Sequence, residues 1–365
     1  MKILQIIFNL SQGGAERFVV DVCNELIKSP KNDIYLLTIN ANNNKSLHYY
    51  ETLSTKVKYK NIGSLKGLCL KSIMGVYKVI KDIKPDIVHI HCSPVLIYLP
   101  SLFYKKAKYV HTIHNLASKA ISFQWLRGFQ KWLFKKHIQP ITISKICQES
   151  YKSFYGQDNA ICITNGRAAL ITTDEAKNVK KEIEGYKKSK DTPVFIHVAR
   201  YAEQKNQELL FNAFNKLHND GKDFLLIIIG AGFDNSPYIH LNETSHIKIL
   251  GTKQNVGDYL ACADYFVLSS IYEGLPLSLL EAMSMGCIPI STPAGGVVDV
   301  IRDGENGLLS PSFDKDNYYK TIKRVFEKDF SIEKNDIIKE YKENYTIEVC
   351  ADSYYGIYRE LTKND

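Results

Sequence analysis

Two acidic residues, Glu273 and Glu281, stand in the segment Ser-Ile-Tyr-Glu-Gly-Leu-Pro-Leu-Ser-Leu-Leu-Glu-Ala-Met, residues 270–283. This segment follows a short β-branched and aromatic run and is expected to lead into a helix. Glu281 then lies about five residues into the helix, where its carboxylate can accept hydrogen bonds from a pair of vicinal hydroxyls such as those of a ribose. Glu273 is expected to face a sugar.

The turn between the two acids is suited to a phosphate. Pro276 marks the expected helix start, because a helix needs no amide hydrogen at its first position. Gly274 lets a ligand approach the backbone closely. The free amides of Leu277 and Ser278 at the helix N-terminus favour an anion. The segment therefore predicts a site for a phosphorylated sugar compound.

A cationic loop supports this interpretation. Arg200 and Lys205 lie in Val-Ala-Arg-Tyr-Ala-Glu-Gln-Lys-Asn, residues 198–206, directly after the expected strand Val194–Val198. A forked guanidinium and an ammonium suit a diphosphate, and ligands of such sheets bind at the carboxyl ends of strands. Two alternatives for the acids remain: a helix-capping acid with a solvated helix residue, or the carboxylate pair of a glycoside hydrolase. Neither explains the two cations.

The first half of the chain offers a glycine turn and a histidine. Gly13 and Gly14 join the first expected strand to a helix, which permits a tight bend or, alternatively, is a plain turn. His114 follows the expected strand Tyr109–Ile113, so we expect it near a ligand. The histidines inside expected strands, His89, His91 and His111, are interpreted as packed or hydrogen-bonded core residues.

The elements that carry these residues alternate short apolar runs with amphipathic segments, which predicts parallel strands joined by crossover helices. With 365 residues the chain is too long for one ordinary core and fits two doubly wound α/β domains. The Lys- and Glu-rich stretch 167–192 is expected to connect a domain of residues 1–166 to one of 193–345. The expected strands are 2–8, 34–38, 87–91, 109–113, 140–143, 160–163, 194–198, 224–229, 247–249, 265–268 and 288–291.

The formal net charge of +8 is concentrated in one region. Residues 101–152 hold ten Lys or Arg and one acid, Glu149. Within it, residues 123–137 are expected to form a helix with a single apolar stripe, Trp125, Leu126, Phe129, Trp132 and Leu133, and with basic residues around it, Arg127, Lys131, Lys135 and Lys136. The segment 121–137, which contains this helix, suits an anionic membrane surface or a lipid-linked acceptor, or else the helix packs on the core with a solvated basic side.

The remaining features predict a cytoplasmic protein. The apolar run at residues 3–8 is expected to be a buried strand and not a signal peptide, and no stretch approaches the roughly 20 apolar residues of a membrane-spanning helix. The eight cysteines include no C-x-x-C pair, so we expect reduced core thiols and no metal site. Gly230-Ala231-Gly232 lacks a third glycine and is weak evidence for a dinucleotide site.

Taken in order, these motifs resemble the retaining GT-B glycosyltransferases of family four, which include many bacterial capsule, lipopolysaccharide and glycolipid enzymes. The resemblance covers nearly the whole chain. It rests on Gly-Gly-Ala-Glu-Arg at 13–17, Thr-Ile-His-Asn at 112–115, Asn-Gly at 165–166, Arg200 with Lys205, Glu273 with Glu281, Gly295-Gly296, and Asp-Gly-Glu-Asn-Gly at 303–307.

The resemblance implies two domains that face each other across a cleft, an acceptor-binding one and a nucleotide-sugar-binding one, with residues 346–365 returning to the first. It implies no cofactor and no metal, a UDP-sugar or GDP-sugar donor, and a glycan or lipid-linked acceptor. The implied roles are as follows: the donor ribose on Glu281, the diphosphate on Arg200 and Lys205, the donor sugar on Glu273 with the backbone of Gly274 and Leu275, His114 beside the anomeric centre, and Gly13 and Gly14 lining the cleft.

Two positions depart from the family pattern. Arg167-Ala168 stands where an apolar residue and Asp often follow Asn-Gly, and Asp299 stands where Glu is common. Two other functions also remain open from the sequence: a nucleotide-sugar epimerase of the same architecture, and a basic nucleic-acid-binding protein.

Overall fold

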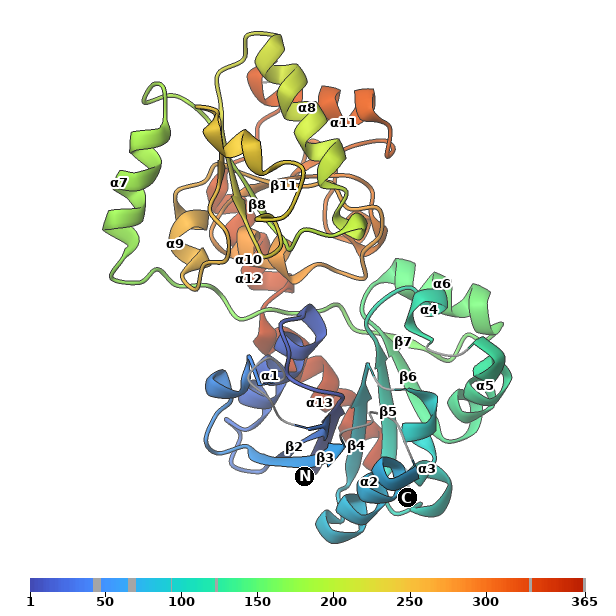
Figure 1. The fold of residues 1–365 in the computed structure, drawn as a ribbon. Coiled ribbons are helices and arrows are strands. Elements are labelled where there is room, and N and C mark those ends of the chain that lie inside the picture. Colours follow the sequence, from blue (N-terminus) through green and yellow to red (C-terminus); the bar gives the residue numbers. More distant parts are fainter. Residues whose placement is uncertain (42–46, 65–69, 93, 122–123, 328–329, 364–365) are drawn as a thin grey trace. The chain divides into compact units, whose positions relative to one another are not determined.

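A computed structural model describes residues 1–41, 47–64, 70–92, 94–121, 124–327 and 330–363 (Figure 1). The chain packs as two compact units. Unit 1 comprises residues 1–168 and 345–365, and unit 2 comprises residues 169–344. Each unit is built on one sheet whose described strand pairings are all parallel. The prediction of two parallel-sheet α/β domains is therefore confirmed.

The sheet of unit 1 has seven strands in the order β3-β2-β1-β4-β5-β6-β7. The strands are β1 Lys2–Ile7, β2 Asp33–Asn40, β3 Lys58–Ser64, β4 Ile87–His91, β5 Lys108–Ile113, β6 Ile138–Thr142 and β7 Ile161–Cys162. The α-helices are α1 Gly14–Leu26, α2 Leu70–Ile83, α3 Pro100–Phe103, α4 Ala117–Ala120, α5 Arg127–Lys136, α6 Lys145–Tyr155 and α13 Ile347–Lys363. Short 3₁₀ turns are η1 Tyr50–Thr52, η2 Val95–Tyr98 and η3 Gln124–Leu126.

The sheet of unit 2 has six strands in the order β10-β9-β8-β11-β12-β13. The strands are β8 Val194–Val198, β9 Leu225–Ile229, β10 Ile247–Ile249, β11 Tyr265–Leu268, β12 Ile288–Ser291 and β13 Leu308–Leu309. The α-helices are α7 Ala176–Tyr186, α8 Gln207–Asn219, α9 Val256–Ala261, α10 Leu277–Ser284, α11 Lys315–Glu327 and α12 Lys334–Asn344. The 3₁₀ turns are η4 Glu203–Lys205, η5 Ile239–Glu243 and η6 Gly295–Asp299.

Strand order indicates the part of each sheet where a ligand is expected to bind. In both sheets the first three strands follow one another toward one side of the sheet, and the later strands are added on the other side of the first strand. The reversal falls between β1 and β4 in unit 1 and between β8 and β11 in unit 2. Loops that leave the carboxyl ends of two such strands diverge, which opens a crevice where ligands of doubly wound sheets bind.

Burial explains why the central strands were predictable. All five residues of β9, Leu-Leu-Ile-Ile-Ile, are buried, as expected for a parallel strand covered by helices on both faces. The last helix, α13, belongs to unit 1, where it packs on α1 and buries Tyr354 and Tyr358. The chain therefore closes the core of unit 1 with a segment from its other end.

The expected strands agree with the structure to within two residues at each end. Two strands, β3 and β13, were not predicted. β3 is an edge strand of sequence Lys-Tyr-Lys-Asn-Ile-Gly-Ser without a buried residue, so it lacks the apolar signal, and β13 has only two residues. Among the described cysteines Cys92 is exposed, which departs from the expectation that the cysteines lie in the core.

Candidate functional site

The loop that carries Arg200 and Lys205 leaves β8, at the switch point of unit 2. Gln207, the first residue of α8, holds this loop in place: its Nε2 donates to the Arg200 carbonyl oxygen at 3.0 Å, and its Oε1 accepts from the Ala202 amide at 3.4 Å. Asn206 caps the helix in the left-handed region with φ of 49°. The backbone between the two cations is therefore fixed from within the loop.

The loop that leaves β11 is joined to the β8 loop by three hydrogen bonds to backbone carbonyl oxygens. The Ile271 amide donates to the Gln204 carbonyl oxygen at 2.8 Å, and Gln204 Nε2 donates back to the Tyr272 carbonyl oxygen at 2.9 Å. The Ser269 hydroxyl donates to the Lys205 carbonyl oxygen at 2.8 Å. Because β8 and β11 are neighbours in the sheet, these bonds connect segments that lie about 65 residues apart in the chain.

Lys205 and Glu273 form a largely buried ion pair. Lys205 Nζ lies 2.6 Å from Glu273 Oε1, and the two side chains are 15% and 8% exposed. The Ser270 hydroxyl donates to the same carboxylate oxygen at 2.6 Å, and Gln204 Nε2 approaches the other at 3.4 Å. The structure thus brings together two of the residues predicted from sequence, but as partners of each other. The carboxylate is held rigidly by three donors.

The loop that leaves β12 completes the arrangement. The Thr292 hydroxyl donates to the Ser270 carbonyl oxygen at 2.7 Å, and the Gly296 amide donates to the Gly274 carbonyl oxygen at 2.9 Å. Gly295 has φ of +55°, and a Cβ there would lie 1.8 Å from the Glu273 carbonyl oxygen. Only glycine fits this position, because both the backbone conformation and the close approach exclude a side chain.

Helix α10 presents its amino end within the same arrangement. Pro276 is the N-cap and the helix begins at Leu277, one residue later than expected. The amides of Leu277 and Ser278 have no acceptor within the helix, since the first turn of a helix leaves its amides unpaired. The side chains of Leu275 and Leu277 are buried, so only their backbone is available to a ligand. Glu281 is the fifth residue of the helix and is half-buried.

Arg200 differs from Lys205 in its surroundings. It is exposed, and within the described part of the chain no acidic side chain forms an ion pair with it. A guanidinium keeps its charge and can bind two oxygens of a phosphate at once. The edge of unit 2 therefore holds one neutralised cation, one available cation and a helix N-terminus, which together favour an anionic ligand.

In unit 1 the predicted glycines begin helix α1. Gly13 is the N-cap with φ of −159°, an extended conformation open to any residue, and Gly14 is the first helical residue. A Cβ on Gly14 would meet nothing within 4 Å, and one on Gly13 would meet the flexible carboxylate end of Glu16. The described residues therefore do not themselves require glycine at these two positions.

His114 follows β5 and is half-buried. Its Nε2 lies 2.9 Å from Nδ1 of His91, and its ring packs edge-on against Phe18 at 5.4 Å. Burial, with a smaller effect from His111, lowers the pKa of His114 to about 3, so the imidazole is neutral at pH 7. His89, His91 and His111 are buried and hydrogen-bonded, as predicted for core histidines, although contact of one of them with His114 was not anticipated.

Arg167, one of the departures from the family pattern, is part of the packing of unit 1. Its guanidinium lies 2.6 Å from Asp21 of α1, and both side chains are buried. Its amide donates to the Tyr345 carbonyl oxygen at 3.0 Å, just before α13. Arg167 therefore joins the first helix of the unit to the segment just before its last helix.

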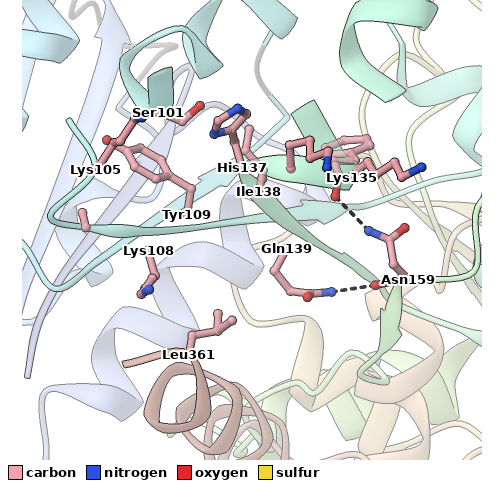
Figure 2. Close-up of a pocket in the computed structure, with 13 residues that line it drawn as sticks. Ser101, Lys105, Lys108, Tyr109, Lys135, His137, Ile138, Gln139, Asn159 and Leu361 are labelled. Carbon is pink, nitrogen blue, oxygen red and sulfur yellow. Dashed lines mark hydrogen bonds between the residues drawn. The ribbon is translucent and has the colours of Figure 1, made fainter. Parts of the chain in front are cut away.

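Four lysines of the basic region lie near the amino ends of β5 and β6, whereas His114 follows the carboxyl end of β5. A cavity of about 540 Å³ opens beside the residues that begin β5 and β6 (Figure 2). Its lining includes four lysines and no acid: Lys105, Lys108, Lys135 and Lys136. Gln139 and Asn159 also line the cavity, with Gln139 Nε2 donating to the Asn159 carbonyl oxygen at 2.7 Å.

The expected aromatic helix is α5 preceded by η3, while residues 122–123 of the predicted segment lie outside the described part of the chain. Leu126 and Leu133 are buried in the core, so the core-facing explanation holds for them. Trp125 and Trp132, however, are 80% and 44% exposed. The predicted single apolar stripe is therefore wrong, since its two tryptophans face away from the core.

No group of three or more His, Cys, Asp or Glu side chains in the described residues is arranged to hold a metal ion. No described helix combines the length and the apolar character that crossing a bilayer requires.

The chain matches two family models in succession. Residues 12–167 match the model described as Glycosyltransferase Family 4, and residues 178–345 match the model described as Glycosyl transferases group 1. Together the two matches cover most of the chain, and each falls largely within one structural unit.

Curated relatives and solved structures agree with these matches. The chain is 27% identical to the Escherichia coli UDP-Gal:alpha-D-GlcNAc-diphosphoundecaprenol alpha-1,3-galactosyltransferase over 73% of this chain and 72% of the relative. It is 27% identical to an uncharacterized glycosyltransferase of Methanocaldococcus jannaschii over 96% and 95% of the two chains. A Rickettsia africae glycosyltransferase structure matches with a TM-score of 0.82, 18% identity and coverage of 100% and 99%. Anabaena HepE in complex with UDP and glucose matches with a TM-score of 0.78, 17% identity and coverage of 99% and 100%.

Proposed function

The chain belongs to the family 4 glycosyltransferases of GT-B fold, and on this basis we propose that it moves a sugar from a nucleoside-diphosphate sugar to a hydroxyl of a glycan or lipid-linked acceptor. The observation that carries the proposal is the hydrogen-bonded junction of the three loops after β8, β11 and β12, which surrounds Glu273 and lies beside the amino end of α10. Arg200, an exposed cation, stands on the first of these loops.

Each residue of this junction has a proposed role toward the donor. Arg200 and Lys205 bind the diphosphate with the backbone amides of Leu277 and Ser278. Glu273 accepts hydrogen bonds from the sugar hydroxyls, with the backbone of Gly274 and Leu275 beside it. Glu281 accepts hydrogen bonds from the ribose. Lys205 forms an ion pair with Glu273. When the donor binds, the Lys205 ammonium also contacts the diphosphate, while the Glu273 carboxylate accepts hydrogen bonds from the sugar.

The reaction breaks the bond between the anomeric carbon and the diphosphate oxygen and forms one from the acceptor oxygen to the same carbon. The acceptor proton passes to a phosphate oxygen of the leaving diphosphate. Charge that develops on the diphosphate is stabilised by Arg200, Lys205 and the helix amides, a preorganised electrostatic effect worth several kcal/mol. Because these groups supply the positive charge, the proposed reaction uses no metal, and attack from the face of the leaving group retains the configuration.

The proposed acceptor side is unit 1. We assign His114 to the surroundings of the anomeric centre, and Gly13 and Gly14 to the acceptor side, where the absence of side chains leaves room for a ligand. Two similar proteins support the substrates: the name of the Escherichia coli relative includes UDP-Gal and a diphosphoundecaprenol acceptor, and Anabaena HepE was solved with UDP and glucose. A UDP-sugar is therefore the first donor to test.

A peripheral contact with an anionic membrane is part of the proposal, at the inner face of the cell membrane. It is supported by the exposed Trp125 and Trp132 and by the basic residues of α5, including Lys135 and Lys136. Aromatic rings insert at the lipid interface while lysines meet anionic headgroups. Binding to vesicles of anionic lipid should fall in Trp132→Ala and in Lys135→Glu with Lys136→Glu. If these variants bound the vesicles as well as wild type, the proposed membrane contact would be excluded.

A two-stage experiment tests the function. A thermal-shift screen of UDP, GDP and their sugars comes first, since a ligand at 100 times its Kd adds about 2.7 kcal/mol of stability. Transfer to acceptors is then followed, and the anomeric configuration of the product is determined by NMR. Formation of a new nucleotide-sugar isomer without acceptor would instead indicate an epimerase, an alternative that nothing in the comparisons supports. Salt-sensitive DNA binding without nucleotide-sugar binding would contradict the proposal.

A further inference from the structure

A continuous chain of hydrogen bonds crosses the core of unit 1 from His114 to the last helix. In order, its links are His114 Nε2 to His91 Nδ1 (2.9 Å), His91 Nε2 to Gln5 Oε1 (2.7 Å), Gln5 Nε2 to Tyr358 OH (3.3 Å), Tyr358 OH to His89 Nδ1 (2.5 Å), and His89 Nε2 to Thr112 Oγ1 (2.8 Å). We call these six residues the relay. All except His114 are buried, so bulk water cannot substitute for a missing partner.

The relay determines which nitrogen of His114 carries hydrogen. An amide oxygen only accepts, so His91 must donate to Gln5 from Nε2. A neutral imidazole has a single N–H, and burial lowers the pKa of His91 far enough to keep it neutral. His91 Nδ1 is therefore an acceptor, and His114 must donate to it from Nε2. This leaves Nδ1 of His114 with a lone pair.

The same polarity continues on the other side of Gln5. Its amide nitrogen donates to Tyr358, so the Tyr358 hydroxyl is free to donate to His89 Nδ1, and His89 then donates from Nε2 to Thr112. Every link from His114 to Thr112 thus points the same way. If the Gln5 amide turned over, the direction of every hydrogen bond on both sides of it would reverse, because each neutral imidazole ring carries a single N–H.

We propose that Tyr358 of α13 is a positioning residue: its hydroxyl oxygen accepts the hydrogen bond from the Gln5 amide nitrogen, and this orientation of the amide keeps His114 in the tautomer whose Nδ1 is a hydrogen-bond acceptor. The consequence for catalysis rests on the proposed function: Nδ1 of His114 accepts a hydrogen bond from a substrate hydroxyl. Residues 5, 89, 91, 114 and 358 then act as one unit, although α13 is more than 230 residues beyond β5 in the chain.

Tyr358→Phe tests the proposal with one atom removed. The Gln5 amide nitrogen would then face an apolar ring, and a buried unpaired N–H costs more than an unpaired carbonyl oxygen. The amide should therefore turn over and donate to His91, which reverses the His91–His114 bond and moves the hydrogen of His114 from Nε2 to Nδ1. Tyr318→Phe is the matched control, because the Tyr318 hydroxyl of unit 2 is buried without a partner among the described residues.

The readout is the nitrogen NMR spectrum of ¹⁵N-histidine-labelled protein, with His114 assigned by the signals lost in His114→Gln. Wild type and Tyr318→Phe should show Nε2–H, and Tyr358→Phe should show Nδ1–H. Gln5→Leu should give the same inversion, since it leaves His91 Nε2 without an acceptor, and it serves if Tyr358→Phe does not fold. An unchanged tautomer in both variants, or Nδ1–H in wild type, overturns the proposal.

Kinetics separate this proposal from the proposed function. We expect kcat of Tyr358→Phe to fall about tenfold while KM for the donor changes little, the pattern of an interaction made in the transition state. Inversion of the tautomer with wild-type kcat would support the positioning by Tyr358 and would remove His114 from the reaction. An unchanged tautomer with reduced kcat would overturn the positioning and leave the glycosyltransferase assignment intact.

Discussion

Replacing Glu273 with Gln should lower the stability of unit 2 and at the same time strengthen its binding of a nucleoside diphosphate. The change keeps the size of the side chain and one acceptor oxygen for Ser270 and Lys205, but it removes the negative charge 2.6 Å from Lys205 Nζ. Lys205 is 15% exposed, so its ammonium would remain largely buried without a counter-charge. Loss of one partner from a buried pair costs about 3 kcal/mol.

The thermal consequence follows from the size of the unit. A loss of 1 kcal/mol lowers Tm by roughly 2–4 °C in a unit of 150–250 residues, so Tm should fall by about 6–12 °C. A bound diphosphate would restore a negative charge beside Lys205. Saturating nucleoside diphosphate should therefore stabilise Glu273→Gln by about 1.4 kcal/mol more than it stabilises wild type, which corresponds to a Kd about tenfold lower. Sugar transfer should fall, since Glu273 is assigned to the sugar.

Differential scanning calorimetry with and without UDP or GDP measures both effects, and Glu203→Gln is the control. Glu203 belongs to the same loop and is exposed, so its replacement should change stability by less than about 0.5 kcal/mol. If Glu273→Gln unfolds at the same temperature as Glu203→Gln, the ion pair contributes nothing. If the nucleotide stabilises Glu273→Gln less than wild type, Lys205 does not meet the diphosphate.

Three further results are expected. Arg200→Ala should lower kcat by about a hundredfold with an unchanged Tm, because this exposed side chain has no ion pair in the described structure; wild-type turnover would exclude it from the site. Glu281→Ala should weaken binding of UDP or GDP about tenfold by calorimetric titration but leave binding of inorganic diphosphate unchanged, and equal affinities would disprove a ribose contact. Burial holds the pKa of His114 at about 3 and that of His91 well below its usual value. Because both rings are neutral in the folded chain, unit 1 should be most stable above about pH 6.5 and should lose stability as the pH falls toward 3. Identical urea midpoints at pH 8 and pH 5 would contradict this.

The sequence alone determined the fold class and most of the secondary structure. Central parallel strands are buried on both faces, so they appear as continuous apolar runs such as residues 225–229, and no tertiary contact is needed to recognise them. The β8 loop and the turn before α10 were equally visible, because Gly, Pro, Arg and Glu stand there at the ends of such runs. Edge strand β3 was missed since it has no buried residue.

Only the tertiary structure decided which of these side chains meet. The spacing of residues along the sequence does not predict which strands are neighbours in the sheet. Because β8 lies beside β11, Lys205 pairs with Glu273, Gln204 bonds to the Tyr272 carbonyl oxygen, and Ser270 bonds to the Glu273 carboxylate. Likewise, a histidine inside an apolar strand is recognisable as buried, but its partner is not. His89 bonds to Tyr358 from the far end of the chain, and that contact exists only because α13 packs back onto unit 1.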